Sequence, residues 1–377
     1  MLASEILKTW RTKNSIDRDL VQNTLYDFFK FHGNVFMMLA TGVGKSKSAL
    51  QCIEDKKTLI ICERIPHIEN WKKEIQKFNI QGDITIICFQ SAKKYTDINW
   101  DLIIIDEVDA CIGPNAMSNY KKMKTKHWIF LSADAEKEHL ELMREICDFK
   151  TFKISLKDAI KWQLLPAPQI IYKPVLLDNK KKYLRVPKTK FLFKSADNNL
   201  KTEKEYDEIL NKEIEYWKSE VVLKGSYSNG KPTFAGFNLF AVGNYRKLFY
   251  SQLKASKALN KKSKDRTIYF TGSIDICKSF KNDIHSKKTK QECQEILDRF
   301  NDGDIHYISC VDKLNRGMNL KNCKKGVVLS ITYKNFIELR QRIGRILRDD
   351  EPVIEIYYVE GKESKLIDKF KKDFETV

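Results

Sequence analysis

Two short stretches carry side chains that together suit the chemistry of a nucleoside triphosphate. The first, LATGVGKS, begins at Leu39 and places Lys45 and Ser46 after two glycines, Gly42 and Gly44. Glycines let backbone N–H groups turn inward around phosphate oxygens, while a lysine can reach the β- and γ-phosphates and a serine hydroxyl can coordinate Mg²⁺. The pattern therefore predicts a phosphate-binding loop (a P-loop, or Walker A motif), although Leu39 occupies the position of its usual first glycine.

The second stretch, DLIIIDEVD, adds three carboxylates directly after an apolar run. A carboxylate at the carboxyl end of a buried parallel strand is poorly placed for a core and well placed for a ligand. We expect Asp106 to hold Mg²⁺, Glu107 to orient or deprotonate a water molecule, and Asp109 to link the site to a moving part. An acidic helix cap is the alternative, but a cap rarely needs three carboxylates in four residues.

A third stretch, QRIGRILR, places Arg342, Arg345 and Arg348 three residues apart. On a helix this spacing presents the three guanidinium groups within one arc. An arginine that reaches a transferring γ-phosphate from another domain can raise the rate by roughly 10³ to 10⁵. A solvated basic helix face is the alternative, and the two preceding stretches favour the catalytic interpretation.

The elements around these stretches indicate an α/β fold. The runs NVFMML, KTLIIC, DITIIC, DLIIID and KHWIFL predict buried strands, and the amphipathic stretches KSKSALQCIED and HIENWKKEIQKF predict helices between the first three. Continuous apolar strands that alternate with helices are typical of a parallel sheet covered on both faces. The pattern returns after residue 265, so we predict two parallel-sheet domains in tandem, at residues 1–164 and 165–377.

The charge of the chain favours a polyanionic partner. Its formal net charge is +18, and residues 180–265 hold 18 Lys and 2 Arg against 9 acidic residues, a net charge of +11. Nucleic acid is the first candidate partner and an anionic membrane surface the second. Aromatic residues interleave with these lysines, so this basic insertion could grip a phosphate backbone and stack on bases. It could equally be a helical insertion with a solvated lysine face and a small aromatic core.

The remaining composition predicts a cytoplasmic protein without a membrane partner. The nine cysteines form no C-x-x-C pair, which is typical of reduced thiols rather than of zinc sites or disulfides. The stretch MLASEILKTWRTK lacks the apolar segment of a signal peptide, and no window approaches the length of a membrane span.

The P-loop, the DExD strand end and the QxxGRxxR helix, in that order on two α/β domains, resemble superfamily 2 helicases and translocases. Other stretches resemble further motifs of that superfamily: TLIICERIPHIENWKKEIQKF, ICFQSAKKY, FLSAD, TIYFTGSID and VDKLNRGMNL. DAIKWQLLPAP is similar to the exit from the first domain in the restriction-subunit, XPB-like and phage UvsW-like branch. That branch commonly reads M-A-T-G-x-G-K-T, so the resemblance accommodates Leu39 as part of a phosphate-binding loop.

The resemblance implies two RecA-like domains that close on ATP and Mg²⁺. It assigns catalysis to Lys45, Asp106, Glu107, Gln341, Arg345 and Arg348. It assigns ATP contacts to Gln22, which would read adenine, and to Thr41, Gly42, Val43, Gly44, Lys45, Ser46 and Gly317, with Ser46 and Asp106 at the metal. It assigns the coupling of hydrolysis to motion to Asp109, Ser132, Ala133 and Arg342. It assigns nucleic-acid contacts to Gln90, Ser91, Thr271 and Asn315.

We therefore expect an ATP-driven helicase or translocase that moves along or remodels branched or duplex DNA, because this branch favours DNA. An RNA helicase is the nearest alternative. A nucleic-acid clamp that does not hydrolyse ATP is a second alternative, since Asp134 occupies the place of the usual threonine in FLSAD. A membrane-surface ATPase that uses the basic insertion is a third. A compact chain of this kind also predicts a recruiting protein partner, whose identity the sequence leaves open.

Overall fold

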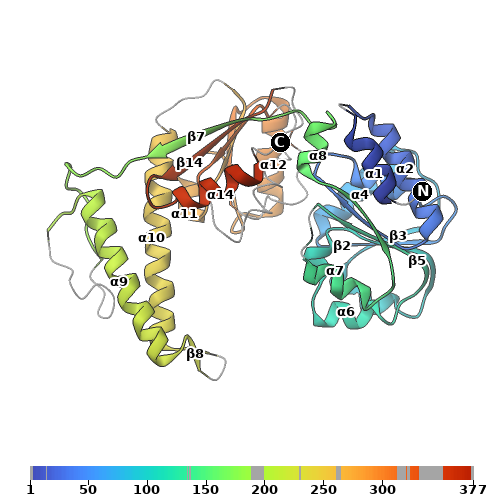
Figure 1. The fold of residues 1–377 in the computed structure, drawn as a ribbon, viewed down its shortest axis with the longest axis horizontal. Coiled ribbons are helices and arrows are strands. Elements are labelled where there is room, and N and C mark those ends of the chain that lie inside the picture. The colour runs from blue at the N-terminus through green and yellow to red at the C-terminus, as the bar shows by residue number, and fades with distance from the viewer. Residues whose placement is uncertain are drawn as a thin grey trace.

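The computed structural model of the chain contains two parallel β-sheets, which lie in two lobes (Figure 1). It describes residues 3–13, 15–133, 135, 137–187, 199–228, 231–259, 265–311, 320, 323–330 and 351–374. The first sheet contains the strands β1 (Val35–Leu39), β2 (Thr58–Cys62), β3 (Ile84–Cys88), β4 (Asn99–Ile105), β5 (Lys124–Ser132) and β6 (Lys150–Ile154). The second sheet contains β7 (Gln169–Val175), β10 (Thr267–Phe270), β11 (Asp283–Ile284), β12 (Tyr307–Cys310), β13 (Lys325–Val328) and β14 (Val353–Val359).

The first sheet has the strand order β3-β2-β4-β5-β1-β6, and all its pairs are parallel. The five apolar runs of the first half of the sequence form β1 to β5, so these strand predictions are confirmed. Every residue of β1 is buried, because alternate side chains enter the cores on opposite faces of the sheet. Met37 and Leu39 join one core, while Phe36 and Met38 join the other.

Helices cover both faces of the first sheet, as a parallel sheet requires. One core receives side chains from α2 (Arg18–His32), α3 (Lys45–Gln51) and α4 (Ile65–Lys77), together with α1 (Ala3–Arg11) and α8 (Leu156–Lys161). The opposite core receives side chains from four further segments: η1 (Phe89–Tyr95), α5 (Val108–Cys111), α6 (Pro114–Tyr120) and α7 (Lys137–Arg144).

Two of the strands that the sequence did not reveal, β6 and β7, are edge strands of their sheets, as is the unpredicted two-residue strand β11. The sequence of β6 is KTFKI, and only Phe152 and Ile154 are buried. β7 reads QIIYKPV and contains Pro174, which is tolerated at a sheet edge because one side of the strand needs no ladder partner. β6 and β7 therefore lack the continuous apolar run that identified the other strands of the first sheet, including β3, whose run ITIIC lies at the opposite edge of that sheet.

The second sheet has the order β11-β12-β10-β13-β14-β7, again entirely parallel. β7 leaves the first lobe after α8 and pairs along its whole length with β14. Around this sheet lie α11 (Ile274–Lys278), α12 (Lys290–Asp302) and α14 (Ser364–Phe374). β6 and β7 belong to different sheets, and the domain limits at 164 and 165 that we predict fall between them.

A helical hairpin projects from the second lobe (Figure 1). It is formed by α9 (Glu203–Lys224) and α10 (Phe234–Leu259), and the short antiparallel pair β8 (Tyr227–Ser228) and β9 (Lys231–Pro232) lies at its far end. The second half of α10 packs on the second sheet, where Tyr250 and Leu253 share a core with strand residues such as Tyr357. The predicted insertion therefore includes a helix that completes the core of the second lobe.

The basic insertion contains a small aromatic core and also exposed aromatic side chains, and its contact with nucleic acid stays a prediction. Tyr206, Trp217, Phe249 and Tyr250 are buried between the helices and the sheet, as an aromatic core requires. By contrast, four aromatic side chains near the far end of the hairpin are largely exposed: Tyr227, Phe234, Phe237 and Phe240. Residues 203–259 carry a net charge of only +2, whereas residues 180–202 carry +7. Most of the charge thus precedes the hairpin rather than lying on it.

A buried ion pair joins α10 to the end of the second sheet. The ammonium of Lys254, 1% exposed, lies 2.8 and 3.0 Å from the carboxylate oxygens of Glu363. Glu363 also accepts a hydrogen bond from the backbone N–H of Val359 at 2.7 Å. Burial lowers the pKa of Lys254, and the carboxylate of Glu363 opposes that shift.

None of the helices within the described ranges has the length and apolarity needed to cross a membrane. All nine cysteines are free thiols, and burial raises the pKa of Cys52 to about 12.

Candidate active site

The predicted site residues of the first lobe gather at one edge of its sheet. β4, β5 and β1 are neighbours, and their carboxyl ends lie at the same edge because the strands are parallel. Lys45 follows the turn after β1, Asp106 follows β4, and Ser132 ends β5. Residues separated by up to 87 positions in the sequence thus meet at one point of the fold.

The turn between β1 and α3 requires its glycines. Gly42 and Gly44 have φ angles of 95° and 111°, in the left-handed region that other residues rarely adopt. A Cβ atom on Gly44 would also lie 3.0 Å from Nε2 of Gln22. The side chain of Val43 is buried, so it anchors the turn while the backbone around it forms a cradle.

Lys45 forms an ion pair with Glu107 across this edge. The Nζ–Oε1 distance is 3.1 Å, and the two side chains are 12% and 18% exposed. Glu107 has a φ of 51°, an unusual value for a residue with a side chain, and it precedes the short helix α5. Strained backbone of this kind concentrates at functional sites, where surrounding structure holds a side chain in place.

Asp106 lies beside this pair and accepts a hydrogen bond from Trp71. The indole Nε1 of Trp71 in α4 is 2.9 Å from Oδ2 of Asp106. Burial and the neighbouring Glu107 carboxylate raise the pKa of Asp106, while the ammonium of Lys45 and the indole N–H lower it. Trp71 was not predicted as a site residue, because an indole on the apolar face of a helix does not indicate that it will reach a carboxylate 35 residues later.

The predicted coupling residues Asp109 and Ser132 are also in contact. The Oγ of Ser132, which is fully buried, donates to Oδ1 of Asp109 at 3.2 Å. Ala133 is partly exposed next to it, and Asp134 lies outside the described residues. The end of β5 is therefore connected by a hydrogen bond to the helix that follows the site carboxylates.

Gln22 of α2 packs against Gly44 of the phosphate loop. Its side chain is 4% exposed, and its Oε1 atom is buried without a hydrogen-bond donor within the part of the chain that the structure describes. An unsatisfied buried amide oxygen is costly, so a ligand with an N–H donor would stabilise it. Ser46 and Thr41 lie in and beside the loop and are partly exposed.

Of the predicted site residues in the second lobe, the structure describes only Thr271. Six of them, Gly317, Asn315, Gln341, Arg342, Arg345 and Arg348, lie outside the described residues, and their contacts remain predictions. Thr271 is fully buried after β10, where its hydroxyl donates to the carbonyl oxygen of Cys310 at 3.1 Å. This burial argues against the predicted contact between Thr271 and nucleic acid. Gln90 and Ser91, in η1, are exposed and partly exposed respectively, as the predicted contact requires.

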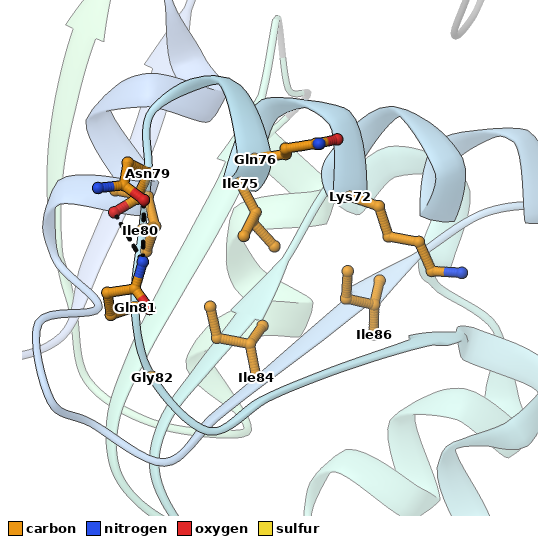
Figure 2. A pocket seen from close by; sticks show the side chains of 9 residues that line it. All are labelled: Lys72, Ile75, Gln76, Asn79, Ile80, Gln81, Gly82, Ile84 and Ile86. Atoms are coloured by element: carbon orange, nitrogen blue, oxygen red, sulfur yellow. Dashed lines mark hydrogen bonds between the residues drawn. The ribbon is translucent and has the colours of Figure 1, made fainter.

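An open hollow elsewhere on the first lobe lacks this chemistry. Figure 2 shows it between the end of α4 and the edge strand β3, where Ile75, Ile84 and Ile86 form its apolar wall. Gln81 and Asn79 on its rim bond to each other at 3.0 Å. It contains none of the predicted site residues, so it offers no alternative centre for catalysis.

Part of the second lobe matches a known protein family. Residues 251–350 match the family model of the helicase conserved C-terminal domain. No curated protein matches the sequence. The matched range begins in the second half of α10, the part that packs on the second sheet.

Three solved structures resemble the whole fold. The helicase domain of Hef from Pyrococcus furiosus is 16% identical with a TM-score of 0.52, over 95% of this chain and 100% of that one. Dbp5 from S. cerevisiae, solved bound to RNA and ADP BeF3, is 11% identical with a TM-score of 0.55, over 91% and 84%. Mss116p, solved bound to ssRNA and AMP-PNP, is 13% identical with a TM-score of 0.52, over 91% and 69%.

These similarities show a fold of two RecA-like parallel-sheet domains in tandem, so the predicted fold class is confirmed. Together with the matched C-terminal domain, they also confirm the resemblance to superfamily 2 helicases. The narrower restriction-subunit, XPB-like and UvsW-like branch stays a prediction.

Proposed function

We propose that the protein is an ATP-dependent superfamily 2 motor that hydrolyses ATP to move along or remodel nucleic acid, with DNA as the preferred substrate. The observation that carries this proposal is the cluster at the carboxyl edge of the first sheet. There Lys45 is paired with Glu107, and Asp106 and Ser132 occupy the neighbouring strand ends. A cation, two carboxylates and a glycine cradle are the groups that phosphate transfer from ATP requires.

The described residues fit ATP with Mg²⁺. The buried Oε1 of Gln22 can accept a hydrogen bond from the exocyclic amino group of adenine, and Gln22 adjoins the turn that would hold the phosphates. Ser46 and Asp106 supply the oxygen ligands that Mg²⁺ prefers. A bound Mg²⁺ would neutralise charge on the phosphate oxygens during transfer.

In this mechanism Lys45 has two alternative partners. In the structure its ammonium is held by Glu107. When Lys45 turns to phosphate oxygens, the carboxylate of Glu107 is released to accept a proton from the attacking water. The hydrogen bond between Ser132 and Asp109 connects that change to the end of β5. Gln341, Arg345 and Arg348 are proposed to reach the phosphates from the second lobe, so that closure completes the site.

The proposal of DNA as the substrate rests on the net charge of the chain and on its resemblance to a branch that favours DNA. The net charge of +18 suits a phosphate backbone, and contacts to that backbone give little sequence specificity. The proposed branch favours DNA. An RNA helicase is the second candidate, because two of the similar structures, Dbp5 and Mss116p, were solved with RNA. A non-hydrolysing clamp is less well supported, since the contact between Ser132 and Asp109 is present despite Asp134.

The deciding experiment measures ATP hydrolysis side by side with single-stranded DNA, duplex DNA, forked DNA and RNA. We expect stimulation by DNA, and strongest stimulation by forked or duplex DNA. Greater stimulation by RNA would replace the proposal with the RNA helicase, and absence of turnover with all four would replace it with the clamp.

Binding should also depend strongly on salt. About six phosphate contacts would lower the affinity roughly 10³-fold or more between 50 and 200 mM salt. Fluorescence anisotropy with labelled DNA measures this slope, and an affinity unaffected by salt would contradict binding through the backbone.

A further inference from the structure

The helix that carries Gln22 is attached to the connection between the two lobes. The guanidinium of Arg18, the first residue of α2, donates from Nη2 to the carbonyl oxygen of Leu164 at 2.7 Å. Just before the helix, the backbone N–H of Ile16 donates to the carbonyl oxygen of Trp162 at 3.0 Å. Only five residues after Leu164, the chain enters β7 of the second sheet at Gln169.

The segment held by Arg18 is a tight, strained helix end. Gln163 has a φ of 58°, in the left-handed region, and the backbone N–H groups of Leu164 and Leu165 both donate to the carbonyl oxygen of Ala159. Trp162 is 1% exposed and packs edge-on against Trp10, with 5.6 Å between ring centroids. Because left-handed backbone is unfavourable for glutamine, contacts from outside the turn must stabilise this conformation.

Arg18 and Gln22 lie four residues apart, so they occupy the same face of α2, one turn from each other. One end of this face lies beside Gly44 of the phosphate loop through Gln22. The other end holds the carbonyl oxygen of Leu164 in the connection. One turn of α2 thus joins the proposed base subsite to the point where the chain leaves the first lobe.

We propose that Arg18 is a positioning residue that transmits adenine binding at Gln22 to the connection between the lobes. An adenine amino group bound to Oε1 of Gln22 fixes α2 in one position, and Arg18 then fixes the turn at Trp162–Leu165. The proposal rests on the proposed ATP site, and it adds a residue that contacts neither nucleotide nor nucleic acid. Two sites are thereby coupled through one element that both contact, which is the physical requirement for coupling.

Hydrogen–deuterium exchange of the full chain can test this directly. The backbone N–H groups of residues 162–165 are all bonded to carbonyl oxygens of α8, so their exchange reports opening of the turn. In the native protein we expect AMP-PNP to slow their exchange about tenfold, within the ordinary range of coupling between sites. Inosine triphosphate, whose base lacks the amino group, should slow it much less at concentrations that give equal occupancy.

Variants of Arg18 distinguish the proposed coupling from a general structural role of this residue. Arg18→Ala should still bind AMP-PNP but lose most of the slowing at residues 162–165, and Arg18→Lys, which keeps a cationic donor, should restore part of it. Asp27→Ala alters an exposed residue on the same helix and should behave like the native protein. In activity measurements, Arg18→Ala should lower kcat for ATP about tenfold with KM changed less than about twofold, whereas Gln22→Ala should mainly raise KM.

Equal slowing of hydrogen–deuterium exchange in Arg18→Ala and in the native protein would overturn the proposed coupling through Arg18. AMP-PNP binding without any slowing of exchange at residues 162–165 would overturn it as well. Either result would leave the proposed ATP site intact. If the native chain bound no adenine nucleotide in the same samples, both the proposed function and the proposed coupling through Arg18 would be overturned.

Discussion

The carboxyl edges of the two sheets share a topology but present different polar groups. In the first lobe, Lys45, Asp106 and Glu107 are charged and partly exposed. In the described part of the second lobe, Thr271 and Ser309 are neutral and fully buried, and their hydroxyls donate to backbone carbonyl oxygens. The polar groups of the first edge could exchange their internal partners for a ligand, whereas Thr271 and Ser309 of the second edge help to hold the fold together.

The same contrast applies to ion pairs. The pair of Lys45 with Glu107 borders the surface at an edge where both partners have a proposed ligand. The pair of Lys254 with Glu363 is buried deep in the second lobe, where no ligand is proposed. Two ion pairs of similar length are therefore expected to respond differently to substitution: the first should affect turnover, and the second should affect stability.

The largest effect is expected from an arginine that the second lobe is proposed to contribute. Arg345→Ala should lower nucleic-acid-stimulated hydrolysis by roughly 10³ to 10⁵ while ATP binding persists, because the guanidinium acts on the transferring phosphate. Steady-state turnover and equilibrium binding of a fluorescent ATP analogue measure the two properties. Lys365→Ala, at an exposed position of the same lobe, is the control. Unchanged turnover in Arg345→Ala would refute the cross-lobe role.

Glu107→Gln should lower hydrolysis by roughly 10² to 10⁴, the usual contribution of a general base. Nucleotide affinity should be retained or increased, because Lys45 no longer has to leave a carboxylate. Thermal unfolding should change little. Glu145→Gln, an exposed position in the same lobe, controls for loss of charge alone. A Glu107→Gln protein with full turnover would remove the assigned role.

Glu363→Gln should affect stability rather than turnover, in contrast to Glu107→Gln. Removing the charge leaves the ammonium of Lys254 buried beside an amide, and breaking a buried pair typically costs about 3–5 kcal/mol of unfolding free energy. The amide oxygen can still accept the hydrogen bond from Val359. Adding Lys254→Met should recover most of the loss, as measured by urea unfolding. Equal stability of the single and double variants would show that the pair does not hold α10 in place.

The smallest effect is expected at Trp71. Trp71→Phe removes the hydrogen bond to Asp106, and hydrogen bonds to charged groups contribute about 1.5–3 kcal/mol. We expect the Mg²⁺ concentration for half-maximal hydrolysis to rise about tenfold or more. Trp128→Phe, which shrinks a buried indole in the opposite core of the same sheet, is the matched control. If both variants shift the Mg²⁺ requirement equally, the hydrogen bond from Trp71 has no specific role.

The sequence predicted the parts of the molecule that depend on local patterns. Central strands were recognisable because both of their faces are buried, and the strand-end residues of the first lobe followed from parallel topology. The edge strands β6 and β7 and the division of the insertion between core and projecting hairpin depend on what each segment packs against. The contacts of Trp71 with Asp106 and of Arg18 with Leu164 join residues far apart in sequence, so no local pattern could indicate them.

The exchange of partners by Lys45 is the central claim, and a crystal structure with Mg²⁺ and a non-hydrolysable ATP analogue tests it most directly. We expect the ammonium of Lys45 to leave Glu107 and contact the β- and γ-phosphates, with adenine bonded to Gln22 and an arginine of the second lobe facing the γ-phosphate. A complex in which Lys45 remains on Glu107 while the nucleotide binds elsewhere would contradict it.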